Sequence, residues 1–286
     1  MAKGSELKGR IKSVENTRKI TRTLEMIATS KMKRAQDRVI AARPYARALA
    51  DVISSLYSRD LEGDFPLLRQ PKTAKKAAVL LLTSNRGMAG GFNANLIKEA
   101  RNLIKRLESE GTAVEIHVSG KKGIGYFRYI GTAMATSRTD IGDKPTAGDA
   151  ASLVDALMTQ FEKQEIDALY VVGAQYKSAL SSPPASERVL PVTPPAKAAS
   201  EKYYLLFPDA GAILSELLPA YVRNTVYKAL VETVAAEQAA RRTAMKSATD
   251  NAGEMLNLLR RTYNRARQAN ITQEIAEIVG GAAALE

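Results

Sequence analysis

The chain has 286 residues, 45% of them hydrophobic, so it can bury the core of one or two domains. It contains no cysteine and a single histidine, His117, which excludes disulfides, thiol catalysis and metal sites built from several cysteines or histidines. The formal net charge of +12 at pH 7 predicts an acidic partner: nucleic acid, anionic lipid or an acidic protein surface.

The first predicted element is one long helix from Leu7 to Leu56. At the 3.5-residue spacing of a heptad, twelve of fifteen positions are apolar, which predicts a coiled-coil helix. We call these positions the N-terminal seam: Leu7, Ile11, Val14, Arg18, Thr21, Glu25, Ala28, Met32, Ala35, Val39, Ala42, Ala46, Leu49, Ile53 and Leu56.

Two features interrupt this pattern. Between the polar seam positions 18 and 25, Ile20, Leu24 and Ile27 carry the apolar stripe one residue out of phase, which predicts a local stutter. Pro44 predicts a kink.

The same helix is strongly basic. Residues 1–50 carry thirteen Lys and Arg against four acidic residues, a balance of +9. A solvated face is the ordinary explanation of such a run. Here, however, the charge falls on nearly every side of the helix outside the seam, so we favour a real acidic counter-surface.

The middle of the chain alternates between strand and helix patterns, which predicts a small α/β domain with a mainly parallel sheet. The joints on either side are residues 63–73 and the proline-rich residues 183–195. The predicted strands are 77–83, 113–118, 168–172, 189–192 and 203–207, and the predicted helices are 93–110, 122–129 and 147–163.

A glycine-rich stretch, TSNRGMAGGFN at residues 83–93, follows the first strand and opens a helix, where a phosphate loop would lie. It matches neither GxxxxGK[ST] nor GxGxxG. We therefore predict a strand-to-helix turn that uses glycine freedom, with Asn93 as the helix cap. A nucleotide site here is a minor alternative.

Other candidate sites are weak. The segment 119–123 could attract an anion at a helix N-terminus, but a solvated basic turn is the favoured interpretation. His117 is expected to be a packed or edge histidine. Asp149, Asp155 and Asp167 offer no pairing on one catalytic face. We expect no catalytic residues and no cofactor or metal site.

The C-terminal segment from Gly211 to about Val279 is rich in good helix formers, and Gly280-Gly281 is its predicted stop. Two very long terminal helices can bury their apolar stripes against each other, so an antiparallel coiled coil is predicted. The smooth, nearly neutral tip would suit an apolar socket, although a frayed terminus is the ordinary interpretation.

Three motifs, in this order, resemble the gamma subunit of bacterial F-type ATP synthases. The first is IKSVENTRKIT at residues 11–21 followed by MIATSKMKRAQ at 26–36, and the second is SNRGMAGGFN at 84–93. The third consists of EQAAR at 237–241, AMKSATDNA at 244–252 and residues 263–284. The resemblance covers essentially the whole chain.

The resemblance implies an α/β fold class, with a long antiparallel coiled coil of the terminal helices and a central Rossmann-like domain without nucleotide. The implied domains are residues 1–60, 61–208 and 209–286. It implies a non-catalytic central stalk that rotates in a hexamer of alpha and beta subunits and couples proton flow to ATP synthesis or hydrolysis. Its further partners would be the epsilon subunit and the membrane c-ring.

The same resemblance implies contact residues. By motif position, Arg267, Gln268 and Thr272 resemble residues that hydrogen-bond a loop of a catalytic subunit. Leu24 and Met26 would pack near the facing C-terminal helix. The tip, residues 275–285, would turn in an apolar sleeve. Residues that would meet acidic side chains on the catalytic subunits are Lys31, Lys33 and Arg34.

Some features depart from the family's pattern. Ala89 stands where many members have cysteine, and the cysteine-bearing insertion of photosynthetic relatives is absent. With no presequence and no apolar run long enough to span a membrane, we expect a peripheral protein on the cytoplasmic face of a bacterial membrane.

Two alternatives remain from the residues alone. A basic coiled-coil protein that binds nucleic acid is the first, opposed by the absence of tryptophan and of a recognisable reading module. A nucleotide-dependent enzyme is the second, and it lacks candidate catalytic groups.

Overall fold

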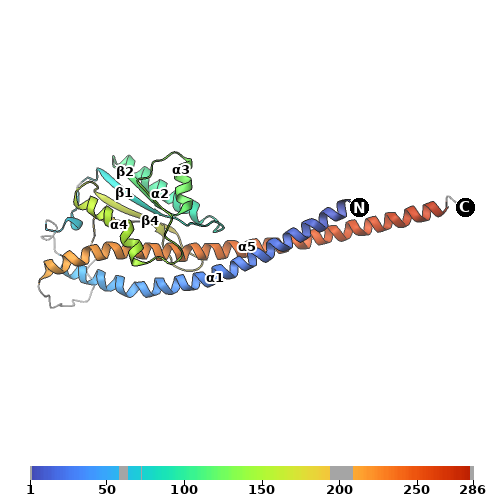
Figure 1. Cartoon of the computed structure of the whole chain (residues 1–286), viewed down its shortest axis with the longest axis horizontal. Coiled ribbons are helices and arrows are strands. Elements are labelled where there is room, and N and C mark those ends of the chain that lie inside the picture. Colours follow the sequence, from blue (N-terminus) through green and yellow to red (C-terminus); the bar gives the residue numbers. More distant parts are fainter. Residues whose placement is uncertain (1, 58–63, 72, 194–208, 284–286) are drawn as a thin grey trace. The chain divides into compact units, whose positions relative to one another are not determined.

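The computed structural model describes residues 2–57, 64–71, 73–193 and 209–283. Two long helices enclose an α/β segment in the sequence (Figure 1). In chain order the elements are α1 (Ala2–Leu56), η2 (Pro66–Leu68), β1 (Lys76–Leu82), α2 (Phe92–Ser109), β2 (Ala113–Ser119), α3 (Lys121–Tyr129), β3 (Thr136–Arg138), α4 (Ala147–Glu162), β4 (Ala168–Ala174), β5 (Pro184–Leu190) and α5 (Ala210–Ala283).

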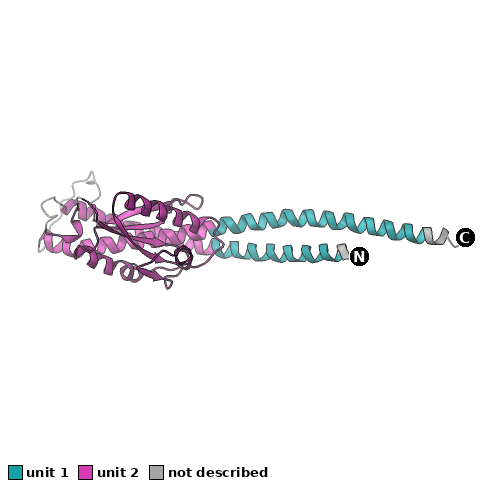
Figure 2. Ribbon diagram, turned by 90° about the horizontal axis from the view of Figure 1, so that it is seen from above, with its two compact units in different colours: residues 1–29, 241–286 teal, residues 30–240 magenta. Residues whose placement is uncertain are grey.

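Contacts divide the chain into two compact units, coloured in Figure 2. Unit 1 comprises residues 1–29 and 241–286, and unit 2 comprises residues 30–240. Both long helices contribute to both units, and each unit is described by itself below. The three ranges predicted from the sequence follow the helices instead, and as folding domains they stay a prediction.

Unit 1 is an antiparallel pair of helices. Thr249 donates to the Thr21 hydroxyl at 2.8 Å, and Arg260 pairs with Glu15 at 2.5 Å, so residue numbers rise on α5 as they fall on α1. The buried residues of α5 here repeat every three or four positions, as in a heptad: Arg241, Met245, Thr249, Ala252 and Leu256. The predicted antiparallel coiled coil is confirmed.

The predicted stutter is wrong. Ile20 and Ile27 are 61% and 47% exposed, whereas the seam position Thr21 is 9% exposed. The seam keeps its phase because its polar residues are accommodated: the Thr21 hydroxyl meets Thr249, and Arg18 lies over Gly253, which has no side chain to displace it.

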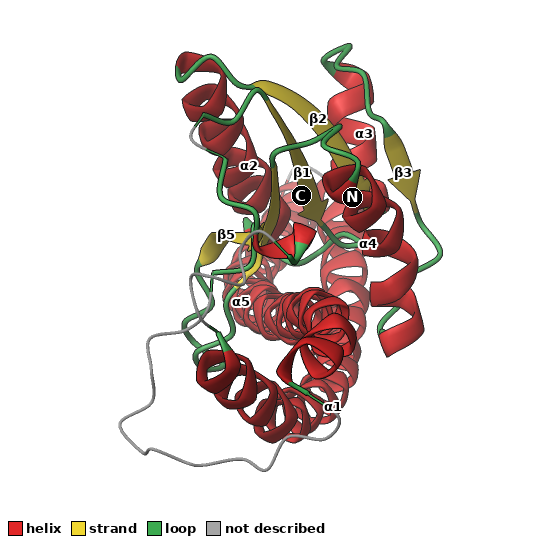
Figure 3. Ribbon diagram, turned by 90° about the vertical axis from the view of Figure 1, so that its left-hand side faces the viewer, coloured by secondary structure: helices red, strands yellow, loops and turns green. Residues whose placement is uncertain are grey.

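Unit 2 is built on a five-stranded sheet of order β3-β2-β1-β4-β5. β1 pairs in parallel with β2 and β4, and β2 pairs in parallel with β3, while β5 runs antiparallel to β4. The mainly parallel sheet is therefore confirmed. Helices lie on both sides of these strands (Figure 3).

The two faces of β1 contribute to two separate hydrophobic cores. Ala77, Val79 and Leu81 pack with α2 and α3, whereas Leu80 and Leu82 pack with α4. Each core also takes in buried side chains from both long helices. The parts of α1 and α5 within unit 2 are thus integral to the domain's interior.

Several predicted boundaries need correction. The predicted strand 189–192 overlaps β5 by two residues only, because β5 runs from Pro184 to Leu190. β3, with three residues, was too short to show a pattern. The helix α5 continues through Gly280 and Gly281 to Ala283, since glycine costs only about 1 kcal/mol in a helix and three alanines follow.

Two further predictions concern the long helices and their neighbours. α1 is a single helix that continues through Pro44, and the predicted kink there stays a prediction. The predicted strand at Tyr203–Phe207 lies outside the described residues.

Candidate functional site: attachment of the sheet to the two long helices

Ligands of open α/β sheets usually bind at the carboxyl ends of the strands, near the point where the strand order reverses. In unit 2 that point lies at β1 and β4. The groups at the carboxyl ends of these strands therefore decide whether a ligand can bind there.

The N-terminus of α3 is closed to anions. Its first backbone N–H groups donate to the loop after β1: Lys121 N to Asn85 Oδ1 at 3.0 Å, and Gly123 N to Thr83 Oγ1 at 3.0 Å. Gly120, with φ of 108°, lets this loop approach, because a Cβ there would lie 2.1 Å from Thr83 O. With these donors satisfied, segment 119–123 is a turn and has no free anion cradle.

The glycine-rich stretch is also structural, but Asn93 is not its helix cap. Gly91 is the N-cap of α2, and it makes no side-chain capping bond. Asn93 instead reaches back: its Oδ1 accepts from Ser84 N at 3.0 Å, and its Nδ2 donates to Ser84 Oγ at 2.8 Å. The side chain fastens the loop to the end of β1.

The carboxyl end of β4 is occupied by α5. Ala174 N–H donates to Thr233 Oγ1 at 3.1 Å, and Tyr176 N–H donates to Glu232 Oε2 at 3.3 Å. A Cβ on Gly173 would lie 2.6 Å from Thr233 Oγ1, so the missing side chain permits this close approach. Burial raises the pKa of Glu232. α5 thus covers the carboxyl end of β4.

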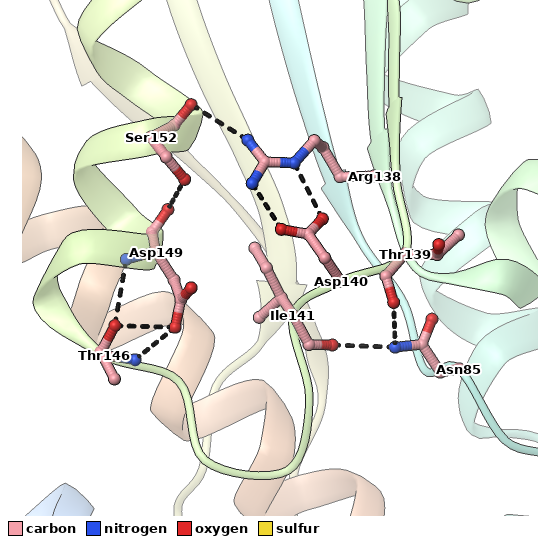
Figure 4. Close-up of polar contacts among 8 residues, drawn as sticks. All are labelled: Asn85, Arg138, Thr139, Asp140, Ile141, Thr146, Asp149 and Ser152. Atoms are coloured by element: carbon pink, nitrogen blue, oxygen red, sulfur yellow. Dashed lines mark hydrogen bonds and ion pairs between the residues drawn. The ribbon is translucent and has the colours of Figure 1, made fainter.

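The loop 139–146, which we call the clasp loop, is fixed at both ends (Figure 4). At its start, Asn85 Nδ2 donates to the carbonyls of Thr139 at 3.1 Å and Ile141 at 2.8 Å. At its end, Thr146 and Asp149 form a capping box at the start of α4.

Beside the clasp loop, the Arg138 guanidinium holds Asp140 with two hydrogen bonds, of 2.8 and 2.5 Å. The hydrogen bond from Arg138 lowers the pKa of Asp140 to about 2. This pairing therefore stays ionised at neutral pH and fixes the loop's start.

The clasp loop attaches the sheet to α1. Lys31 Nζ lies 2.5 Å from Asp143 Oδ2, and an Arg38 N–H donates to the Asp143 carbonyl at 3.1 Å. Gln36 also donates to the Tyr176 hydroxyl from α1. Lys31 was predicted from the family resemblance to meet acidic residues of a partner, and within this chain it already contacts a carboxylate.

The other predicted contact residues on α1 are more open. Lys33 pairs with Asp37 one turn away at 3.1 Å, and Arg34 donates to Ser30 Oγ at 3.1 Å, both at exposed positions. Leu24 is half-buried. Met26 is 58% exposed and lies between the seam positions Glu25 and Ala28, and its packing near the facing C-terminal helix stays a prediction.

The C-terminal contact residues Arg267, Gln268 and Thr272 are all exposed, as is every described side chain from 267 to 279. The Thr272 hydroxyl donates to the Gln268 carbonyl at 2.9 Å. Ile271, Ile275 and Ile278 form an exposed apolar stripe at helical spacing. The structure leaves this end of α5 without a partner among the described residues.

His117 is packed, as predicted. It is 4% exposed, its Nδ1 lies 2.8 Å from Thr136 Oγ1, and its Nε2 lies 3.2 Å from Glu115 Oε1. Within the described ranges, no three His, Asp or Glu side chains gather as metal ligands. None of the described helices is long and apolar enough to cross a membrane.

Sequence reasoning missed the residues that attach the sheet to the helices: Glu232, Thr233, Gly173 and Asp143. The one signal available was the pair Glu232-Thr233, which lies in an otherwise apolar stretch of α5. Polar residues in such a stretch need partners. Their partners on β4 are known only once the fold brings residues 174 and 176 beside them.

A family model described as ATP synthase matches residues 3–285. The ATP synthase gamma chain of Gemmatimonas aurantiaca is 63% identical, and that of Leptospira biflexa is 45% identical, each over 100% of both chains.

Solved structures agree in fold. A chain of the Euglena gracilis mitochondrial ATP synthase, in a structure of OSCP/F1/c-ring, has a TM-score of 0.68 at 18% identity, covering 99% of this chain and 95% of that one. A chain from the Tetrahymena thermophila central stalk/c-ring structure has a TM-score of 0.62 at 22% identity, covering 80% and 99%.

Proposed function

Because the chain belongs to the gamma-chain family of ATP synthases, we propose that it is the central rotor shaft of a proton-translocating F-type ATP synthase. It rotates within a hexamer of alpha and beta subunits, which hold the catalytic sites. The chain itself carries no catalytic residue and transmits torque between that hexamer and a membrane ring.

The structural observation that supports this proposal is the attachment of the sheet to both long helices. Where a related fold would bind a cofactor, Thr233 and Glu232 of α5 take the backbone N–H groups at the end of β4. The clasp loop holds α1 through Asp143. This geometry supports a domain that is hydrogen-bonded to both long helices.

The exposed end of α5 supports a contact with the hexamer. Arg267 and Gln268 are the hydrogen-bonding groups proposed to meet a loop of a catalytic subunit, together with Thr272. Ile271 and Ile275 expose apolar area that a sleeve would cover. Torque then depends on contacts that differ between rotary positions.

The basic face of α1 is the second proposed contact. Lys33 and Arg34 are exposed and available to acidic side chains of the catalytic subunits. Lys31 would also meet an acidic side chain of the partner while it is paired with Asp143. Leu24 and the exposed Met26 would border the same surface.

The remaining partners are proposed from the family. The related solved structures are of a central stalk with its c-ring and of OSCP/F1/c-ring, so we infer that this chain stands on a ring of c subunits beside an epsilon subunit. We further propose the cytoplasmic face of a bacterial membrane as its location.

The test is ATP synthesis by the complete complex in vesicles carrying a proton gradient. The variant Arg267→Ala with Gln268→Ala should assemble but synthesise ATP at least about tenfold more slowly, the effect expected from losing one charge-assisted contact. The matched control is Asn257→Ala with Arg261→Ala, an exposed pair on the same helix, which should retain synthesis.

Normal synthesis by the Arg267 and Gln268 variant would overturn the assigned contacts. Failure of the wild-type chain to join the hexamer at all would overturn the shaft itself. A salt-dependent association with nucleic acid should then be measured.

A further inference from the structure

We propose that unit 2 binds a small amphipathic monoanion, with an apolar body and one carboxylate, in a groove between α1 and α5. The groove has a volume of about 320 Å³, within the range of small-molecule sites. Its lining residues all belong to unit 2, whereas the exposed end of α5 belongs to unit 1, so this proposal stands independently of the proposed hexamer contacts.

Alanines create the groove. Ala42, Ala46 and Ala50 recur every four residues on α1 and face the groove, and their methyl groups are too short to fill the space before α5. Across the gap, Tyr221 and Thr225 lie one turn apart on α5. Elsewhere larger seam residues such as Leu49 and Ile53 are buried.

The floor of the groove is apolar. Val39 of α1 and Val231 of α5 line it, and each is only 2% exposed. The tyrosine ring of Tyr221 adds an aromatic wall. A hydrocarbon chain or a small ring would bury apolar surface here, at about 25 cal/mol per Å².

The mouth of the groove is cationic. Arg43 and Arg47 lie one turn apart on α1, and Lys228 faces them from α5. Across the described residues, the Arg47 guanidinium has neither a hydrogen bond nor an ion pair. It is the group best placed to take a ligand carboxylate with two parallel hydrogen bonds.

Two acidic side chains limit the charge of the ligand. Glu187 lies 4.0 Å from Lys228, and Glu232 is engaged with the Tyr176 N–H. Three cations against two carboxylates leave a single positive charge over the groove. A monoanion matches this charge, whereas a phosphate dianion would be repelled by the carboxylates.

The first experiment is isothermal titration of the full-length chain with octanoate. We expect one molecule bound per chain. Acetate lacks the apolar body and octylammonium reverses the charge, so neither should bind measurably. Absence of octanoate binding, or equal binding of octylammonium, would overturn the proposal.

Two variants locate the site. Ala46→Leu fills the groove and should abolish octanoate binding, and Arg47→Gln should weaken it about tenfold. Arg101→Gln, at an exposed position on α2, is the matched control and should bind as the wild type does.

Should Ala46→Leu fail to fold, Arg47→Gln still decides, because that side chain is exposed and unpaired. Undiminished octanoate binding by Arg47→Gln would place the ligand elsewhere and contradict the assignment.

Discussion

The hydroxyl oxygen of Thr233 on α5 accepts a hydrogen bond from the backbone N–H of Ala174 at the end of β4, at 3.1 Å. Neighbouring Gly173 would collide with that oxygen if it carried a side chain. A buried donor is thereby satisfied at the edge where open sheets usually bind ligands. The helix α5 therefore covers the carboxyl end of β4 and is hydrogen-bonded to the sheet there.

Gly173→Ala should destabilise the chain by about 1–3 kcal/mol, because the new Cβ would lie 2.6 Å from Thr233 Oγ1 while its other neighbours stay at ordinary distances. Urea unfolding followed by circular dichroism measures this.

A double-mutant cycle separates this clash from a general glycine effect. Thr233→Ala removes the colliding oxygen but leaves the Ala174 N–H unsatisfied, at a cost of about 1–3 kcal/mol. Adding Gly173→Ala to Thr233→Ala should therefore cost much less than Gly173→Ala alone. Additive costs would show that the contact with Thr233 is not the cause.

The two buried threonines of the unit 1 seam give a second prediction. Thr21 also donates to the Arg18 carbonyl, and the Met245 carbonyl, 2.8 Å from the Thr249 hydroxyl, is an alternative acceptor for its single proton. Replacing both threonines by valine keeps the shape and buries more apolar surface, so unfolding should cost about 1 kcal/mol more. Urea unfolding checks this.

Its control uses two exposed threonines on the same helices. Thr17→Val with Thr262→Val changes the same atoms where little surface is buried, and stability should stay within about 0.5 kcal/mol of the wild type. If the buried pair proves strongly destabilising as valine, the Thr21–Thr249 contact contributes more than its geometry suggests.

The sole histidine gives a pH prediction. Burial lowers the pKa of His117 below its ordinary value of 6.5, although Glu115 opposes this shift. A lowered pKa favours the neutral imidazole in the folded state. The stability it contributes is therefore fully present above pH 6.5, and it declines as the pH falls from 6.5 toward the folded pKa.

Nuclear magnetic resonance titration of the single imidazole measures this pKa without ambiguity of assignment. His117→Gln should remove both the signal and the decline in stability below pH 6.5. A measured pKa of 6.5 or above would contradict the dominance of burial over the Glu115 carboxylate.

The clasp loop gives a fourth prediction. Asp143→Ala removes the ion pair with Lys31, but both side chains are about one-third exposed, at 33% and 35%. Solvent screening keeps such pairs weak, so stability should fall by less than about 1 kcal/mol. The hydrogen bond from Arg38 to the backbone carbonyl of residue 143 remains possible in this variant.

If the chain is the rotor shaft, we expect Asp143→Ala to affect coupling more than folding. In the complete complex, Asp143→Ala should lower ATP-driven proton pumping relative to ATP hydrolysis. Unchanged pumping would indicate that the bonds of α5 to β4 suffice to hold the shaft.

Much of the fold could be predicted because it depends on periodicity. The N-terminal seam was placed from apolar spacing alone, and Ala28, Met32 and Val39 are buried where it expected them. The stutter predicted at Ile20 was wrong for a physical reason. Thr21 and Thr249 come from opposite ends of the chain and contact each other in unit 1, and no local pattern predicts that contact.

Candidate contact residues such as Arg267 came only from the resemblance to a family motif, and their contacts stay predictions. The bonds of Thr233 to Ala174 and of Lys31 to Asp143 join residues far apart in sequence, and these depend on how the sheet meets the helices. Asn93 shows the same limit, because its side chain hydrogen-bonds Ser84 and does not cap its own helix.

The central claim is that this chain turns inside the hexamer, and direct observation of rotation tests it. Because the chain lacks cysteine, Leu180→Cys, at a position 94% exposed, offers a single attachment point for a visible probe. With the alpha and beta subunits fixed to a surface and ATP supplied, the account predicts stepwise rotation of the probe in one direction. A probe that stays still on a complex that is hydrolysing ATP would contradict it.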